Sequence, residues 1–121
     1  MNKSKQKGTA FETAAVRYLR EQLGSEHIMR QPLAGSKDLG DIAGVECGAG
    51  KVVIECKAYA SQPKLAQWLR EAETERNNAG AAVGVIVAKR RGVGDKNIGK
   101  QLVAMTLDNF IKLLKGENNE R

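Results

Sequence analysis

Residues 40–57 constrain the fold of this chain more than any other stretch. Two short runs rich in valine and isoleucine flank a Gly-Ala-Gly turn, which predicts a β-hairpin. The second run is almost entirely apolar until it ends in Glu55-Cys56-Lys57. Side chains alternate along a strand, so Glu55 and Lys57 share one face and Cys56 lies on the other. Folding about the turn then places Asp41 opposite this charged end, with a tolerance of about one residue.

Charged groups at the open end of an apolar hairpin allow two interpretations. Charge beside a buried strand is costly unless it is paired or bound to a metal. The simpler interpretation is an ion pair of Lys57 with Asp41 or Glu55 at an exposed sheet edge. In the other, the two carboxylates hold a hard divalent cation, and the ammonium lies beside a water that the cation polarises. The spacing alone leaves both interpretations open.

Asp41 followed by Glu55-Cys56-Lys57 at the end of an apolar strand resembles the Asp…Glu-x-Lys signature of the PD-(D/E)XK nuclease superfamily. Gly40 stands where that signature usually has proline. The resemblance spans about residues 5 to 115 and is closest to the archaeal and phage-type Holliday junction resolvases. It implies an α/β fold with a restriction-endonuclease-like αβββαβ core, a mixed five-stranded sheet flanked by helices.

The resemblance also implies a function and a set of site residues. The function is metal-dependent, structure-selective DNA cleavage by phosphodiester hydrolysis, most closely that of Holliday junction resolution, with Mg²⁺ as the cofactor and Mn²⁺ as its substitute. Glu12, Asp41, Glu55 and Lys57 would be the catalytic residues. Glu12, Asp41, Glu55 and the backbone carbonyl of Cys56 would bind the metal.

Two of these assignments compete with alternatives. Glu12 follows Gly8 in a Gly-x-x-x-Glu pattern that the related resolvases carry on their first helix, but Thr9 to Glu12 is also a capping-box sequence, in which Glu12 would bond to the backbone of Thr9. Asp38 competes with Asp41 for the metal, and we favour Asp41 because it immediately precedes the apolar run.

Periodicity predicts the remaining elements. A helix over 9–23 leads to a short strand over 27–31, and after the hairpin a helix over 63–78 follows. Its inner face is predicted to be Leu65, Leu69 and Ala72, with Trp68 as a further candidate, and its charged residues, Glu75 among them, should be exposed. Residues 81–88 are apolar on both faces, as in a central strand, and a right-handed crossover should make this strand parallel to an earlier one. A strand over 101–106 and a helix over 107–115 follow, with Thr106 as the cap. This last helix should pack inward through Leu107, Phe110, Ile111 and Leu114.

Basic side chains lie on both sides of the predicted site. The net charge is +6, which favours a polyanionic partner. The glycine-rich stretch 89–100 has five basic residues against one acid, typical of a phosphate-contacting loop or of a solubilising surface loop. In the related resolvases the connection before the aspartate carries a serine near the scissile phosphate, which Ser36 matches. The predicted DNA contacts are Arg30, Ser36, Lys37, Lys89, Arg90, Arg91 and Lys96.

Length and composition bound the rest. A chain of 121 residues predicts one domain, with 1–7 and 117–121 as flexible tails. The two cysteines lack zinc spacing, and neither a signal peptide nor a membrane-length apolar run is present, so we expect reduced thiols and a cytoplasmic location in a prokaryotic cell or phage-infected host. One catalytic centre per chain predicts a homodimer on a four-way junction. The alternatives are a restriction- or repair-type endonuclease on duplex or flap DNA, or a catalytically inactive DNA-binding module.

Overall fold

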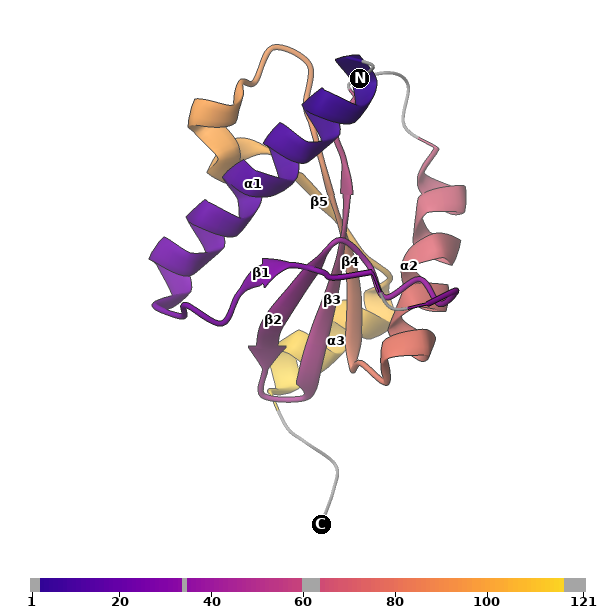
Figure 1. The fold of residues 1–121 in the computed structure, drawn as a ribbon. Coiled ribbons are helices and arrows are strands. Elements are labelled where there is room, and N and C mark those ends of the chain that lie inside the picture. The colour runs from indigo at the N-terminus through magenta and orange to yellow at the C-terminus, as the bar shows by residue number, and fades with distance from the viewer. Residues whose placement is uncertain (1–2, 34, 60–63, 117–121) are drawn as a thin grey trace.

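The computed structural model describes residues 3–33, 35–59 and 64–116 (Figure 1). In chain order the elements are α1 (Lys3–Leu23), β1 (Met29–Arg30), β2 (Ile42–Cys47), β3 (Gly50–Lys57), α2 (Leu65–Ala79), β4 (Val83–Ala88), the 3₁₀ helix η1 (Asp95–Lys100), β5 (Leu102–Ala104) and α3 (Leu107–Lys115). None of the helices in these ranges has the length and apolarity needed to cross a membrane.

The strands form one mixed sheet in the order β1-β2-β3-β4-β5. β3 and β4 are parallel, and the other neighbours are antiparallel. The predicted hairpin is confirmed, because Cys47 pairs with Gly50 around a two-residue turn. The predicted parallel strand is also confirmed, and β4 is buried along nearly its whole length.

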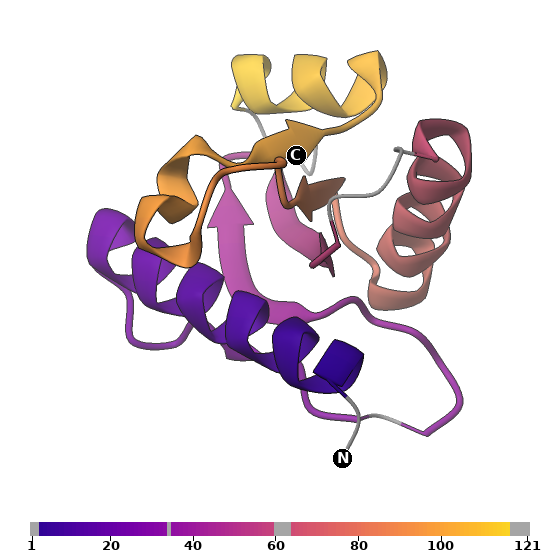
Figure 2. The same ribbon diagram turned by 90° about the horizontal axis from the view of Figure 1, so that it is seen from above.

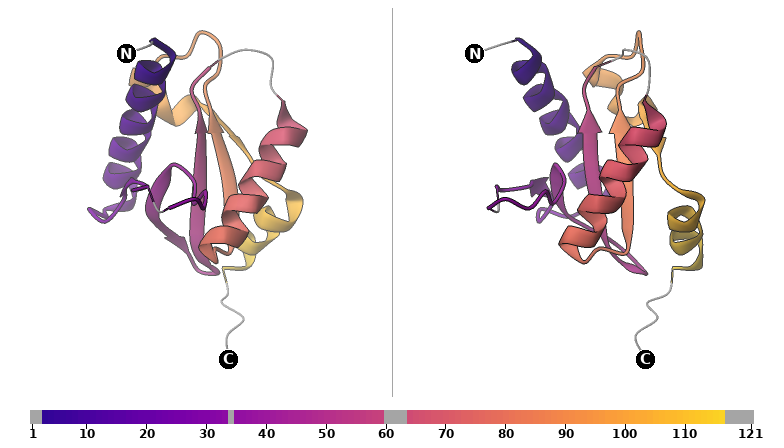
Figure 3. Two further views of the ribbon diagram at one scale, coloured as in Figure 1. Left: turned by 45° about the vertical axis from the view of Figure 1, so that its right-hand side comes forward. Right: turned by 90° about the vertical axis from the view of Figure 1, so that its right-hand side faces the viewer.

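Helices cover both faces of the sheet, as the view from above shows (Figure 2). On one face, α1 and η1 pack over a cluster that includes Ala15, Ile54 and Val85. On the other face, α2 and α3 lie against β4 (Figure 3), and Trp68 and Ala72 pack on Ile86. The open five-stranded sheet between helices agrees with the predicted α/β class.

α1 begins at Lys3, earlier than the predicted start at Thr9. Thr9 is therefore inside the helix and is not its N-cap. The capping-box alternative for Glu12 is wrong for this reason, and the Glu12 carboxylate instead accepts a hydrogen bond from Arg30.

α2 buries Ala72 as predicted, and the candidate Trp68 too, but it is rotated relative to the prediction at Leu65 and Glu75. Its buried residues are Trp68, Ala72 and Glu75, while Leu65 is 45% exposed. The expectation that Glu75 faces solvent is therefore wrong. The phase of the helix follows the large indole of Trp68, which gains most from burial. The predicted start of this helix at Pro63 lies outside the described residues.

α3 has the predicted bounds and the predicted cap, since the Thr106 hydroxyl accepts a hydrogen bond from the Asn109 N–H. Its orientation is opposite to the prediction, because Leu107, Phe110, Ile111 and Leu114 are exposed. The reason is that β5 leaves part of the edge of β4 unpaired. β5 pairs only with residues 86–88 of that strand. The carbonyls of Ala82 and Gly84, before the paired part, accept hydrogen bonds from Lys112 and Asn109. Satisfying these buried carbonyls turns the polar side of α3 inward.

Candidate metal centre

The site is built at the end of β3. Ile42 pairs with Ile54, and the Asp41 N–H donates to the Ile54 carbonyl at 2.8 Å. Beyond this point β3 has no β2 partner, and the Asp41 carboxylate takes that place by accepting the Cys56 N–H at 2.7 Å. The prediction that Asp41 lies opposite the Glu55–Lys57 end is therefore confirmed.

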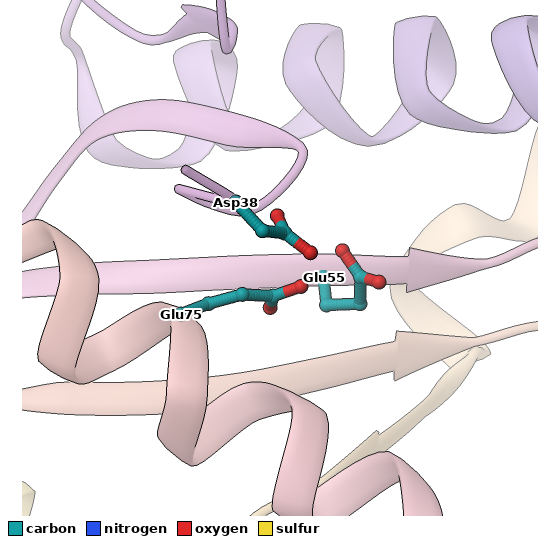
Figure 4. A group of neighbouring side chains, drawn as sticks. All are labelled: Asp38, Glu55 and Glu75. Atoms are coloured by element: carbon teal, nitrogen blue, oxygen red, sulfur yellow. The ribbon is translucent and has the colours of Figure 1, made fainter. Parts of the chain in front are cut away.

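Three carboxylates from different elements converge beside this position (Figure 4). Asp38 comes from the loop before β2, Glu55 from β3 and Glu75 from α2, and one ligand oxygen of each lies within 4.8 Å of the others. Glu75 is fully buried, and among the described residues neither of its oxygens has a hydrogen-bond partner. Within the described ranges, no other group of three or more His, Cys, Asp or Glu side chains has its ligand atoms this close together.

The loop that carries Asp38 is held against α2. The Asn78 side-chain amide donates to the Asp38 backbone carbonyl at 2.9 Å. The Asp38 carboxylate in turn accepts the Gly40 N–H at 2.9 Å. Asn78 lies three residues after Glu75, so one face of α2 positions both the loop and the buried acid.

Burial and neighbouring negative charge raise the pKa values of two acids. Burial, followed by the neighbouring Asp41, raises the pKa of Glu55, while Glu75 and the Lys57 charge partly oppose this. Burial also raises the pKa of Glu75, and Asp38 and Glu55 raise it further. Carboxylates this close cannot all be ionised unless a cation compensates their charge. Without a cation, at least one of them holds a proton. The cluster is therefore a group of acids that could hold a proton or a hard cation.

Lys57 is fixed beside these acids. Its Nζ lies 2.8 Å from Glu71 Oε1, 3.5 Å from Glu55 Oε2 and 5.9 Å from the centre of the Trp68 ring. Burial alone would lower the pKa of Lys57, but the hydrogen bond to Glu71 and the charge of Glu55 outweigh it, so the net shift is upward. The side chain is therefore an ammonium at neutral pH.

Glu12 approaches from the opposite face of the sheet. Its Oε1 accepts a hydrogen bond from Arg30 Nε at 3.1 Å. Burial, then the charge of Asp41, raises the pKa of Glu12, and Arg30 opposes them. Glu12 and Asp41 are therefore neighbours, but the predicted set of Glu12, Asp41 and Glu55 does not gather as Asp38, Glu55 and Glu75 do. The two glutamates of the predicted set come from opposite faces, and the metal-binding roles of all three stay predictions.

The backbone of Cys56 has the orientation that the predicted role requires. In a strand, the N–H and C=O of one residue point to the same side. Because the Cys56 N–H points to Asp41, its carbonyl does so too. The thiol packs against the core cluster under α1. Burial and the surrounding carboxylates, Asp41 first, raise the pKa of this thiol, so it stays protonated.

The predicted DNA contacts divide into two groups. In one group the side chains make contacts within the chain: Arg30 pairs with Glu12, Lys89 Nζ donates to the Val93 carbonyl at 2.6 Å, and Arg90 donates to the Lys100 carbonyl at 3.0 Å. The loop after β4 starts beside the site, because the Lys89 N–H donates to the Lys57 carbonyl. The other group consists of Ser36, Lys37, Arg91 and Lys96, which are solvent-exposed, as Arg30 and Arg90 also are.

Two features of this region were not predicted from the sequence. Glu75 occupies a core position in the Trp68–Ala72–Glu75 spacing, so an acid at a four-then-three interval from a tryptophan was the available signal. A groove beside α1 is lined by Arg17, Arg20 and Arg30 together with Glu21 and Glu26. Its arginines come from two elements, so their proximity depends on how α1 packs beside β1.

Comparison with known protein families, with curated proteins and with solved structures finds no match to this chain.

Proposed function

We propose that this protein is a divalent-cation-dependent endonuclease of the PD-(D/E)XK type that hydrolyses phosphodiester bonds in DNA, with a four-way junction as its substrate. The observation that carries the proposal is the meeting of Asp41 and Glu55 at the end of β3, with the Lys57 ammonium 3.5 Å from Glu55. The chain order of helix, three strands, helix and strand supports it, because that is the expected order of an αβββαβ nuclease core.

The residues present fit a hard cation. Carboxylate and carbonyl oxygens are the ligands that Mg²⁺ and Mn²⁺ prefer, and the partly buried Glu55 carboxylate beside Asp41 would be stabilised by a counter-charge. Asp41, Glu55 and the Cys56 carbonyl would hold the ion, with Glu12 nearby. When bound, the ion supplies Lewis acidity and makes water a better nucleophile at neutral pH.

Lys57 supplies positive charge at a fixed position. Because its pKa is raised, it donates hydrogen bonds and does not act as a base. An ammonium held between Glu71 and Glu55 is preorganised to stabilise the negative charge that develops on a phosphate during cleavage. Removing it should therefore reduce the rate more than the affinity for DNA.

DNA must be held by residues outside the acidic cluster, because the cluster repels phosphates. The exposed Lys37 and Arg91, on the loops before β2 and after β4, and Lys96 on η1 are suited to this task. The groove with Arg17 and Arg20 lies on the α1 side of the sheet and reaches Glu12 through Arg30, which lines the groove and pairs with Glu12.

The test is cleavage of a four-way junction, a flap and a linear duplex, incubated in parallel with Mg²⁺, Mn²⁺ or a chelator. We expect ion-dependent cuts in the junction, and none with Glu55→Gln. Glu46→Gln, the same change at an exposed position on β2, should cut like the wild type.

Other outcomes would lead elsewhere. Cleavage of flap or duplex in place of the junction would indicate a repair- or restriction-type enzyme. Junction binding without cleavage under any ion would overturn the proposal in favour of a DNA-binding module.

A further inference from the structure

We infer that Asp38, Glu55 and Glu75 form a cation site of their own, which takes a hard divalent ion such as Mg²⁺ or Mn²⁺ beside the position assigned above to Asp41 and Glu55. The inference deepens the proposed function, on which it rests for the role of the shared Glu55. Binding of an ion to these three carboxylates does not itself require DNA cleavage.

Glu75 is the residue that points to a ligand. It is 0% exposed, it extends from α2 toward Glu55 and Asp38 (Figure 4), and in the described part of the chain its two oxygens accept no hydrogen bond. A buried carboxylate in this position is costly unless something compensates its charge. A helix that already buries Trp68 and Ala72 would be more stable with an apolar residue there.

The surroundings hold the three acids together. Gly84 lets α2 lie close to β4, since a Cβ at that position would be 2.7 Å from the Ala72 carbonyl oxygen. Asn78 ties the Asp38 backbone to the same helix. The acids therefore come from three elements whose relative positions are fixed by backbone contacts, as the ligands of a metal site must be.

This site differs from the predicted one in its ligands and in its place. Glu55 and Glu75 lie on the α2 side of the sheet, whereas Glu12 reaches Asp41 from α1. One Asp41 oxygen is already committed to the Cys56 N–H. Glu55 has two oxygens and lies beside both Asp41 and Glu75, so it can serve both positions.

Protons are the competing occupant, because two carboxyl groups can share one proton in place of an ion. The two possibilities predict different behaviour for Glu75→Gln. A glutamine copies the protonated acid, so it would replace a proton-sharing glutamate without loss. It lacks the negative charge that a divalent ion needs, so it would not replace a ligand.

The experiment is a titration of the full-length protein with Mn²⁺ alone, with free Mn²⁺ followed by electron paramagnetic resonance and thermal unfolding measured in parallel. We expect Glu75→Gln to bind one Mn²⁺ fewer per chain, or to bind it about tenfold or more weakly, on the scale seen when ligand shells are disturbed. Glu75→Gln should also lose most of the Mn²⁺-induced rise in melting temperature. Glu46→Gln should match the wild type in both measurements.

Asp38→Asn is the second variant. Asp38 is exposed on a loop, so its replacement tests the site even if Glu75→Gln does not fold. Wild-type Mn²⁺ binding by both variants would overturn the inference. A Glu75-dependent ion in a protein that cuts no DNA would refute the proposed function and leave the inference standing. DNA cleavage with unchanged Mn²⁺ binding by both variants would refute the inference and leave the proposed function standing.

Discussion

The ammonium of Lys57 lies among two carboxylates and an indole ring, and these neighbours determine what it can do. They keep it charged and hold it in place. We therefore predict that Lys57→Ala lowers the single-turnover rate of junction cleavage by about 10²-fold or more, the scale of losing one preorganised electrostatic contact. Junction affinity without added metal should change by only about threefold, since one phosphate contact at most is lost.

Lys51→Ala is the matched control. Lys51 lies on the same strand, at its far end and exposed to solvent, so this variant should cleave at the wild-type rate. Equal losses of affinity and rate in Lys57→Ala would place Lys57 in DNA binding and contradict the role given to it here.

Glu55 and Glu75 make stability depend on pH in an unusual direction. Their pKa values are raised in the folded protein, so the folded state holds protons that the unfolded chain releases above about pH 4.3. Stability from such protons is complete below the unfolded pKa and is lost as the pH rises through the folded pKa. Without metal, the free energy of unfolding should fall as the pH rises from about 5 to the folded pKa values, about 8 for Glu55 and about 10 for Glu75. The slope is at most about 1.4 kcal/mol per pH unit for each proton.

Urea denaturation in a chelator, at a series of pH values, measures this effect. Glu75→Gln should flatten the dependence, because the glutamine does not titrate. Comparing the two proteins cancels the general repulsion that a net charge of +6 causes at low pH. A wild-type stability that rises with pH across this range would show that the acids are ionised in the metal-free fold.

At the scale of elements, sequence patterns located most helices and strands but not the sides of α2 and α3 that face the sheet. The hairpin and the parallel β4 follow from local signals: the turn, the period of two and a run apolar on both faces. The phase of α2 depends on which of several apolar residues the sheet accepts, and in the structure Trp68 and Ala72 pack on Ile86. The side of α3 that faces inward depends on carbonyls that a short β5 leaves available, which no local pattern encodes.

The candidate site was predicted only in part for the same reason, because local sequence patterns do not show how separate elements pack together. Asp41, Glu55 and Lys57 could be placed together because hairpin register alone brings them near one another. Asp38 and Glu75 meet only because α2 approaches the loop before β2, a contact between segments far apart in the sequence. A charged residue on a helix normally faces solvent, and Glu75 was predicted to be exposed for that reason.

The close approach of α2 to β4 depends on Gly84. A Cβ there would come within 2.7 Å of the Ala72 carbonyl oxygen, so backbone would have to move. We predict that Gly84→Ala lowers the free energy of unfolding by about 1–3 kcal/mol, as for other overpacked cores. Urea denaturation measures it, with Gly94→Ala as the control, because a Cβ at Gly94 meets no atom within 4 Å. Equal stability of the two variants would mean that α2 is not held by this contact.

At the scale of the whole molecule, the outer side of α3 is an exposed apolar surface. Leu107 and Leu114 are 73% and 66% exposed, and Phe110 and Ile111 lie between them. Exposed apolar stripes of this kind commonly mark interfaces. A junction-cutting enzyme with one centre per chain needs a second copy, and a two-fold pair could bury this stripe against itself. We therefore predict a homodimer formed through α3.

Leu114→Asp should convert the dimer to a monomer without unfolding it, because the side chain is largely exposed and contributes little to the core. Sedimentation velocity measures the change, and Lys115→Glu, which alters charge on the same helix but removes no apolar surface, is the control. The monomer should still cut a junction strand in Mg²⁺ but should lose the paired cut on the opposite strand, since its site is intact and its partner is absent. A wild type that sediments as a monomer while cutting both strands together would exclude α3 as the interface and require the two cuts to come from successive encounters.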